Sequence, residues 1–111
     1  MSNNDLFSMQ GKLVLVTGAS SGIGRAIART FVEHGARAHI CDVDESALAR
    51  FRSEAPAVGQ TVADVSKLDD VERLFEDAMR SLGGLDVLVN NAGIAGPTAN
   101  VEDIRPEDWD R

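Results

Sequence analysis

The sequence predicts an α/β fold in which helices cover both faces of a parallel sheet. Short apolar runs alternate with longer segments whose apolar residues recur at helical spacing, an order typical of strand–helix–strand units with right-handed crossovers. The first run, 12–16, is apolar after its lysine, as expected for a strand buried on both faces. Since no repeat or linker divides the 111 residues, we expect one folded unit.

The first strand is preceded by a polar segment and followed by a glycine-rich turn. Residues 1–10 show no periodicity and are expected to form a flexible N-terminal tail, so that the domain covers 11–111. The helix after the turn has an apolar face made of Ile27, Ala28, Phe31 and Val32. Gly35 is expected to end this helix, because glycine takes the left-handed conformation of a helix C-terminus at little cost.

Two further strands each end at an aspartate. The second strand is predicted over 38–41 and ends at Asp42, and the third over 60–63 and ends at Asp64. Asp44 is expected to cap the helix between them. The apolar residues of that helix are Ala47, Leu48 and Phe51. Because the carboxyl ends of parallel strands meet at one edge of a sheet, both aspartates are expected at that edge.

The third helix has the longest apolar stripe of the chain. Ser66 and Asp69 are spaced as in a capping box, which predicts the start of the helix. The stripe recurs at intervals of three and four residues and consists of Val71, Leu74, Phe75, Ala78, Met79 and Leu82. The glycine pair at 83–84 is expected to end the helix.

A fourth apolar strand, 87–89, completes the predicted sheet. We expect the strand order 3-2-1-4 of a Rossmann-type doubly wound sheet, with the remainder of that fold missing from this sequence. Residues 90–100 read as a loop, and 105–111 read as the beginning of a further helix. With four strands alone, 87–89 would form an apolar edge open to solvent.

Composition and charge exclude several classes of protein. The formal net charge of −7 argues against a nucleic-acid binder, which usually carries a basic face. No apolar run is long enough to span a membrane, and the start has no signal-peptide pattern, so we expect a cytoplasmic protein. Cys41, the one cysteine, is interpreted as a small buried strand residue. His34 and His39 match no metal-ligand spacing, and no metal site is expected.

The turn after the first strand has the chemistry of an anion site. Gly18, Gly22 and Gly24 leave backbone N–H groups and the start of a helix open to a phosphate, and Ser20 and Ser21 add hydroxyl donors. The spacing of these glycines matches neither the G-x-G-x-x-G fingerprint nor a P-loop. A plain tight turn therefore remains an alternative at this point.

The two aspartates could provide a second and a third contact for a ligand whose phosphate binds at the turn. Asp42 stands about 20 residues beyond the turn, where an acidic side chain accepts hydrogen bonds from an adenosine ribose. Its charge would repel a 2′-phosphate, and neither Ser21 nor Val43 supplies a basic group, so NAD is favoured over NADP. Asp64 could accept from an adenine amino group while Val65 packs on the ring. Each aspartate could instead simply open a loop.

Four segments together resemble the N-terminal half of the classical short-chain dehydrogenases/reductases. They are TGASSGIG at 17–24, DV at 42–43, ADV at 63–65 and NNAG at 90–93. The resemblance covers essentially all of 11–111, and the combination of the four segments in this order and spacing is far more specific than any one of them.

This resemblance implies a role for each matching residue. The coenzyme phosphates would be held by Gly18, Ser20, Ser21, Gly22, Ile23 and Gly24. Asp42 with Val43 would lie at the adenosine ribose. Asp64 with Val65 would hold the adenine ring, and Asn90 would brace the central strands. The ribose on the nicotinamide side would lie beside Asn91, Ala92 and Gly93.

The resemblance also implies an activity whose catalytic groups this chain does not carry. The family transfers hydride between a nicotinamide ring and an alcohol or carbonyl substrate, using a tyrosine and lysine four residues apart, a serine and an asparagine. The sequence has no tyrosine, and its two lysines, Lys12 and Lys67, precede the fourth strand. We therefore expect no catalytic residue here, and interpret the chain as the coenzyme-binding part of a protein about twice as long that forms homo-oligomers.

Two other functions fit parts of the pattern. A non-catalytic nucleotide-binding or interaction module could use the same turn. An S-adenosylmethionine-dependent methyltransferase also places a glycine turn after its first strand and an acidic residue after its second. The NNAG segment and the serines of the glycine turn argue against the methyltransferase.

Overall fold

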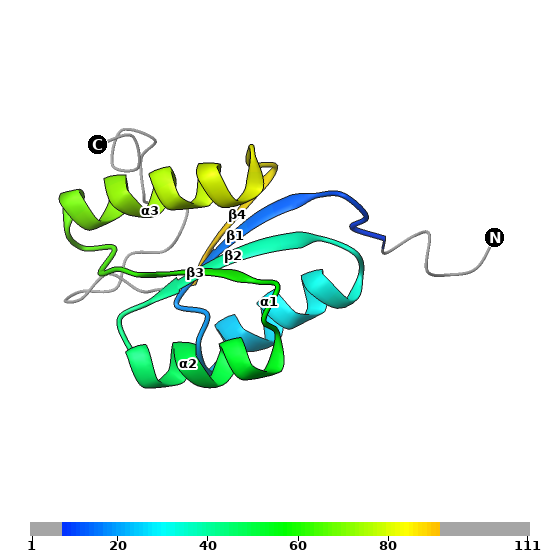
Figure 1. Ribbon diagram of the computed structural model, residues 1–111, viewed down its shortest axis with the longest axis horizontal. Helices are drawn as coiled ribbons and strands as arrows, with labels where there is room; N and C mark the ends of the chain where they lie inside the picture. Colours follow the sequence, from blue (N-terminus) through cyan, green and yellow to red (C-terminus); the bar gives the residue numbers. More distant parts are fainter. Residues whose placement is uncertain (1–7, 92–111) are drawn as a thin grey trace.

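The structure is a computed structural model that describes residues 8–91. Strands and helices alternate along this part of the chain (Figure 1). The elements are β1 (Leu13–Thr17), α1 (Gly22–Glu33), β2 (Arg37–Asp42), α2 (Glu45–Glu54), β3 (Gly59–Val62), α3 (Leu68–Leu82) and β4 (Val87–Asn90). Each predicted strand is present, with ends shifted by no more than one residue from the predicted ones.

The four strands form one parallel sheet in the order β3-β2-β1-β4, which confirms the predicted order. At the centre of the sheet, Val16 of β1 is the register partner of Ile40 in β2 and of Val89 in β4. Since all strands run the same way, their carboxyl ends lie at one edge, and every loop that leaves a strand starts there.

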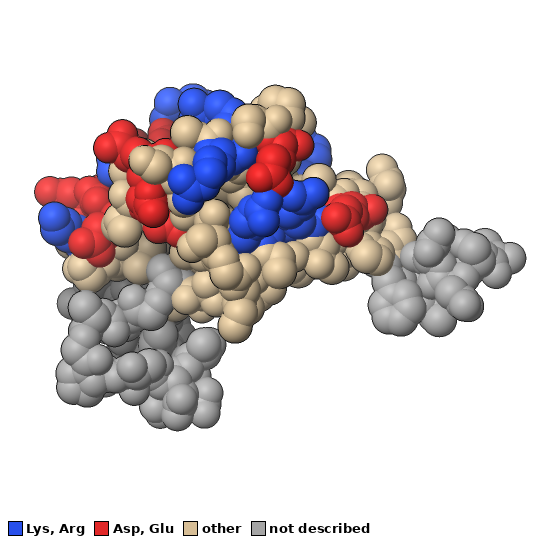
Figure 2. Space-filling view, turned by 90° about the horizontal axis from the view of Figure 1, so that it is seen from below, with Lys and Arg blue, Asp and Glu red and all other residues tan. Residues whose placement is uncertain are grey.

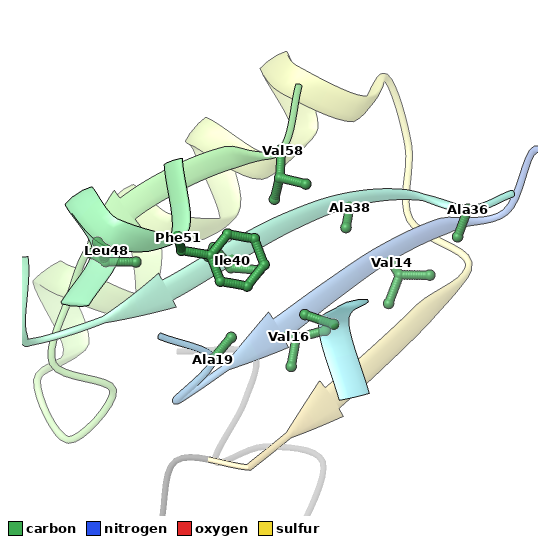
Figure 3. Packing of buried hydrophobic residues seen from close by; sticks show 10 residues of the cluster. Val14, Val16, Ala19, Ala36, Ala38, Ile40, Leu48, Phe51 and Val58 are labelled. Carbon is green, nitrogen blue, oxygen red and sulfur yellow. The ribbon is translucent and has the colours of Figure 1, made fainter. Parts of the chain in front are cut away.

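Helices cover both faces of the sheet, and each face has its own core. In Figure 1, α3 lies on one face while α1 and α2 lie on the other. Val14 and Val16 point to the α1/α2 face, where they pack in one cluster with Ile40 and Phe51 (Figure 3). Leu15, between the two valines, belongs to the cluster on the α3 face. This alternation explains why β1 is apolar from Leu13 to Val16.

The predicted helix ends are mostly confirmed. The Asp44 carboxylate caps α2 by accepting from the backbone N–H of Ala47 at 3.0 Å. Gly35 and Gly83 have positive φ angles of 99° and 81° just after α1 and α3.

The predicted capping box of α3 is wrong. The helix begins at Leu68, with Lys67 in the N-cap position and no side-chain cap. The Ser66 hydroxyl donates instead to the Asp64 carboxylate at 2.6 Å, and Ser66 lies one residue before the N-cap position. Ser66 and Asp64 thus form a local turn of their own.

The cysteine and the two histidines lie where a structural role predicts them. Cys41 is 1% exposed in β2, and burial raises the pKa of its thiol to about 12. His39 is buried beside Cys41, with its Nε2 2.7 Å from the Thr61 hydroxyl oxygen. The Nδ1 atom of His34 lies 2.8 Å from the carbonyl oxygen of Thr30 at the end of α1.

The two ends of the described part, at Met9 and at β4, also contact the sheet. Met9, within the predicted tail, donates its backbone N–H to the His34 carbonyl at 2.8 Å and packs against the core. Within the described part, β4 pairs with β1 alone, and Leu88 is 37% exposed. No described helix is long and apolar enough to cross a membrane. Most of the predicted loop and the helix at 105–111 lie outside the described residues.

Candidate functional site

The sheet brings the predicted site residues together at its carboxyl edge. The glycine turn follows β1, Asp42 ends β2, Asp64 follows β3 by two residues, and Asn90 ends β4. Ala92 and Gly93, the other two predicted site residues of the fourth segment, lie outside the described residues. Residues that are far apart in the sequence thus share one edge because β1 lies between β2 and β4.

The glycine turn is held against the start of α1 by direct backbone packing. Gly18 and Gly22 have φ angles of 60° and 62°, which favour glycine. A Cβ at Gly24 would lie 2.0 Å from the carbonyl oxygen of Gly18, closer than real contacts allow. The helix therefore starts in contact with the turn, which leaves no room for a side chain at position 24.

The first turn of α1 has the properties of an anion site. The backbone N–H groups at the start of a helix have no partner within the helix, and the helix dipole adds positive charge there. Ser21 occupies the N-cap position but makes no side-chain cap hydrogen bond, and the first turn contains no acidic residue. Around Gly22 a Cβ would meet nothing within 4 Å. These groups fit the phosphates of a dinucleotide.

Basic side chains lie next to this turn on the α1/α2 face. A hollow there is lined by Ser20, Ser21, Gly22, Arg25, Arg50 and Glu54. Arg25 and Arg29 of α1 both form ion pairs with Glu54 of α2 and so link the two helices. On this face, seen in Figure 2, Lys and Arg side chains lie beside Asp and Glu side chains. Such partly exposed pairs add little to stability.

Asp42 is bound directly to the glycine turn, a contact that sequence reasoning missed. One carboxylate oxygen accepts from the backbone N–H of Ser20 at 3.2 Å and from its hydroxyl at 2.6 Å. The other accepts from the backbone N–H groups of Val43 and Asp44 at 2.7 and 3.3 Å. Partial burial opposes ionisation, but these hydrogen bonds outweigh it, so the pKa of Asp42 lies below its ordinary value. The carboxylate is therefore charged at neutral pH.

Asp64 presents one carboxylate oxygen to the site. Its other oxygen, Oδ1, accepts from the backbone N–H and the hydroxyl of Ser66 at 2.9 and 2.6 Å. These two hydrogen bonds hold the pKa of Asp64 below its ordinary value. Within residues 8–91, no hydrogen bond occupies Oδ2, and Val65 beside it is half-buried. The pair thus offers an acceptor and an apolar surface.

Thr17 ties β1 to β4 immediately before the glycine turn. Its hydroxyl donates to the Asn90 side-chain oxygen at 2.8 Å and accepts from the backbone N–H of Asn91 at 3.0 Å. The side-chain amide of Asn91 donates in turn to the Gly18 carbonyl at 3.0 Å. Sequence reasoning missed Thr17 as a site residue; the one available signal was a polar residue at the end of an otherwise apolar strand.

The variant Thr17→Val is expected to lower the free energy of unfolding by about 1–3 kcal/mol, because the shape is kept while partners of a hydroxyl that is 1% exposed lose their hydrogen bonds. Urea denaturation measures this change. Thr30→Val is the matched control, since the Thr30 hydroxyl makes an exposed contact with the Ala26 carbonyl. Equal losses in the two variants would contradict the bridging role of Thr17.

The described residues suit a nucleotide better than a metal ion. Within residues 8–91, no group of three or more His, Cys, Asp or Glu side chains is placed to hold a metal. The edge instead combines helix N–H donors with two ionised acceptors, Asp42 and Asp64. N–H donors at the centre are suited to phosphate and acceptors at the sides are suited to hydroxyl and amino groups, an arrangement compatible with an adenine dinucleotide.

Comparison with known proteins gives consistent matches over the chain. The family model described as short chain dehydrogenase matches residues 12–111. A short chain dehydrogenase/reductase of Gibberella zeae is 38% identical over 110 residues, which are 96% of this chain and 41% of that protein. A glucose 1-dehydrogenase of Gluconobacter oxydans is 45% identical over 105 residues, 90% of this chain and 39% of that protein.

Solved structures agree with the sequence matches. A 3-ketoacyl-(acyl-carrier-protein) reductase from Brucella melitensis, complexed with NADH, superposes with a TM-score of 0.75 and 40% identity, covering 93% of this chain and 43% of that chain. The chain thus spans about 40% of the length of the relatives it matches. Since the family model matches nearly the whole sequence, the chain belongs to the short chain dehydrogenase family.

Proposed function

We propose that this chain forms the coenzyme-binding part of an NAD-dependent oxidoreductase that transfers hydride between the nicotinamide ring and a small alcohol or carbonyl substrate. The observation that carries the proposal is the combination, at one sheet edge, of a glycine-rich helix start with the charged carboxylates of Asp42 and Asp64. Family membership supports it and argues against the methyltransferase alternative.

The phosphates are proposed to lie at the start of α1. The bound coenzyme supplies the hydride-carrying ring, and the chain's own residues bind and orient it. Backbone N–H groups and the helix dipole attract the phosphates, and the glycines of the turn allow close approach. The residues given this role are Gly18, Ser20, Ser21, Gly22, Ile23 and Gly24. The Ser21 hydroxyl, which caps nothing in α1, can donate directly.

The adenosine half is proposed to lie across the ends of β2 and β3. Asp42, with Val43 beside it, accepts from the ribose hydroxyl groups. The Ser20 hydroxyl and amide occupy one oxygen of Asp42, so the ribose must share or replace that contact. Asp64 accepts from the adenine amino group through its second oxygen, and Val65 packs on the ring.

The nicotinamide half is proposed to pass the end of β4. Asn90 holds Thr17 and so keeps β1 and β4 together, while Asn91, Ala92 and Gly93 would border the ribose on this side. The relatives, which include a glucose 1-dehydrogenase and an NADH-bound reductase, support a nicotinamide coenzyme and a small-molecule substrate. For the complete enzyme we further propose a homo-oligomer in the cytoplasm.

Asp42→Asn tests the coenzyme assignment. We expect wild type to bind NAD more tightly than NADP, because the Asp42 charge accepts from ribose hydroxyl groups and repels a 2′-phosphate. The variant should weaken NAD binding by about tenfold or more, the effect of losing hydrogen bonds to a charged group, and NADP binding much less. Calorimetric titration with both coenzymes measures the ratio of the two dissociation constants.

Asp69→Asn is the matched control, since Asp69 is an exposed carboxylate in the first turn of α3, away from β2. It should leave both dissociation constants unchanged. Tighter binding of NADP than of NAD by wild type would overturn the NAD assignment. Binding of neither coenzyme would overturn the proposed function as a whole.

A further inference from the structure

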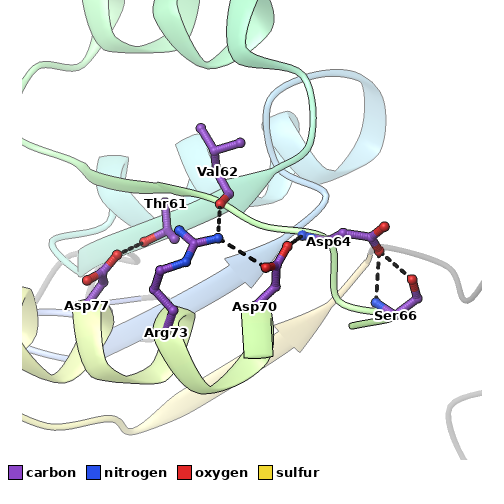
Figure 4. Close-up of polar contacts among 7 residues, drawn as sticks. All are labelled: Thr61, Val62, Asp64, Ser66, Asp70, Arg73 and Asp77. Atoms are coloured by element: carbon purple, nitrogen blue, oxygen red, sulfur yellow. Dashed lines mark hydrogen bonds and ion pairs between the residues drawn. The ribbon is translucent and has the colours of Figure 1, made fainter. Parts of the chain in front are cut away.

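Two similar Asp-x-x-Arg pairs lie along α3, but only one of them reaches the site. Asp70 pairs with Arg73 at 3.4 Å, and two helical turns later Asp77 pairs with Arg80 at 3.0 Å. Both aspartates also contact the β3 segment, as Figure 4 shows. Asp77 accepts from the Thr61 hydroxyl at 2.9 Å within the strand. Asp70, by contrast, contacts the loop that follows β3.

Asp70 holds the backbone of the proposed adenine-binding residue. Its Oδ2 accepts from the backbone N–H of Asp64 at 2.8 Å. Its Oδ1 faces Arg73, and the same Arg73 nitrogen donates to the carbonyl of Val62, at the end of β3, at 2.7 Å. Asp70 is therefore held from two sides, by Arg73 of its own helix and by the backbone N–H of Asp64, while Arg73 is itself bound to the last residue of the strand (Figure 4).

Asp64 is fixed at every polar atom except one. Asp70 binds its backbone N–H, and its backbone carbonyl accepts from the Lys67 N–H at 3.0 Å. Ser66 occupies carboxylate oxygen Oδ1 twice. Within residues 8–91, only Oδ2 remains without a hydrogen bond, so its direction is set by the contacts of the other atoms. A single oriented acceptor can select a base that carries an amino group at this position.

We propose that Asp70 is a positioning residue for coenzyme recognition: anchored by Arg73, it fixes the Asp64 backbone so that the free Asp64 oxygen meets the adenine amino group. Asp70 itself does not touch the coenzyme, and the inference rests on the proposed adenine contact of Asp64. The network sets the selectivity for the base, because a shifted acceptor loses its hydrogen bond while the phosphate contacts at α1 are unaffected.

Two coenzymes that differ at position 6 of the base, and in the proton that N1 then carries, test this role. NAD carries the amino group, whereas nicotinamide hypoxanthine dinucleotide has a carbonyl oxygen in its place. Wild type should bind NAD more tightly, since the carbonyl oxygen would face the Asp64 carboxylate. Asp70→Ala should reduce this preference by roughly two- to tenfold, the range expected for one hydrogen bond, mainly by weakening NAD binding. Asp70→Asn keeps an oxygen acceptor and should retain part of the preference.

Asp77→Ala is the matched control, because it removes an equivalent helix-to-strand carboxylate together with its Arg80 pair, away from Asp64. It should keep the wild-type preference even if it lowers stability to the same extent. An unchanged preference in Asp70→Ala, or an equal loss in Asp77→Ala, overturns the positioning role. If Asp70→Ala does not fold, Asp70→Asn takes its place in the comparison. A preference for NAD that is no higher in Asp77→Ala than in Asp70→Asn then overturns the positioning role.

Failure of the underlying function has a different signature. If wild type binds NAD and the hypoxanthine coenzyme equally, the adenine contact of Asp64 is absent, and the role of Asp70 falls with it. If wild type prefers NAD and Asp70→Ala does so to the same extent, the adenine contact stands and only the role of Asp70 is overturned.

Discussion

Gly24→Ala is expected to lower the free energy of unfolding by about 3 kcal/mol or more, at the upper end of what overpacking costs. The new Cβ would lie 2.0 Å from the carbonyl oxygen of Gly18 and 2.6 Å from the side-chain nitrogen of Asn91. The first neighbour is backbone, which cannot turn aside. Alanine in a helix normally stabilises it relative to glycine, so a loss here isolates the steric effect. Chemical denaturation followed by circular dichroism measures it.

Gly83→Ala is the control for Gly24→Ala. Gly83 has a φ angle of 81° and nothing within 4 Å of its added Cβ, so this variant loses only the left-handed preference of glycine, about 1 kcal/mol. A Gly24→Ala protein as stable as Gly83→Ala would show that α1 can move away from the turn. That result would contradict the close packing described for the site.

Phe51→Ala is expected to cost about 3–5 kcal/mol, the range for removing a buried aromatic ring. Phe51 is 1% exposed and holds α2 on the sheet through contacts in the cluster that contains Ile40 and Leu48 (Figure 3). Thermal unfolding with a parallel urea titration gives the change.

Two further variants bracket the effect at Phe51. Phe51→Leu keeps most of the apolar volume and should lose much less than the alanine variant. Leu68→Ala removes a side chain that is 49% exposed at the start of α3 and should change stability by less than about 1 kcal/mol. A Phe51→Ala loss no larger than that of Leu68→Ala would show that α2 is not held by this core.

The fold was predictable because its signals are local and repeated. Each strand of the sheet is a short apolar run, and each helix has an apolar stripe, as in the segment from Val71 to Leu82 that became α3. Strict alternation of the two kinds of element leaves few topologies for a sheet with right-handed crossovers. The strand order therefore followed from the pattern, whereas the start of α3 did not, because Ser66 can bond to Asp64 as readily as to a helix.

The segments at the carboxyl edge could be found from the sequence, but Thr17 and the contacts that join the segments could not. The segments around Gly18, Asp42, Asp64 and Asn90 could be found by their composition and spacing. The hydrogen bonds that join them could not, since Ser20 meets Asp42 across 22 residues and Thr17 meets Asn90 across 73. Such contacts depend on which strands are neighbours and on side-chain directions, which periodicity does not contain.

The close contact of Gly24 with Gly18 has a consequence for the entropy of ligand binding. A glycine-rich loop would ordinarily sample many conformations, and a ligand would have to restrict them on binding. Here the start of α1 restricts them already in the folded chain. The turn is thus ordered when the chain folds, and the proposed dinucleotide would bind without the entropy cost of ordering it.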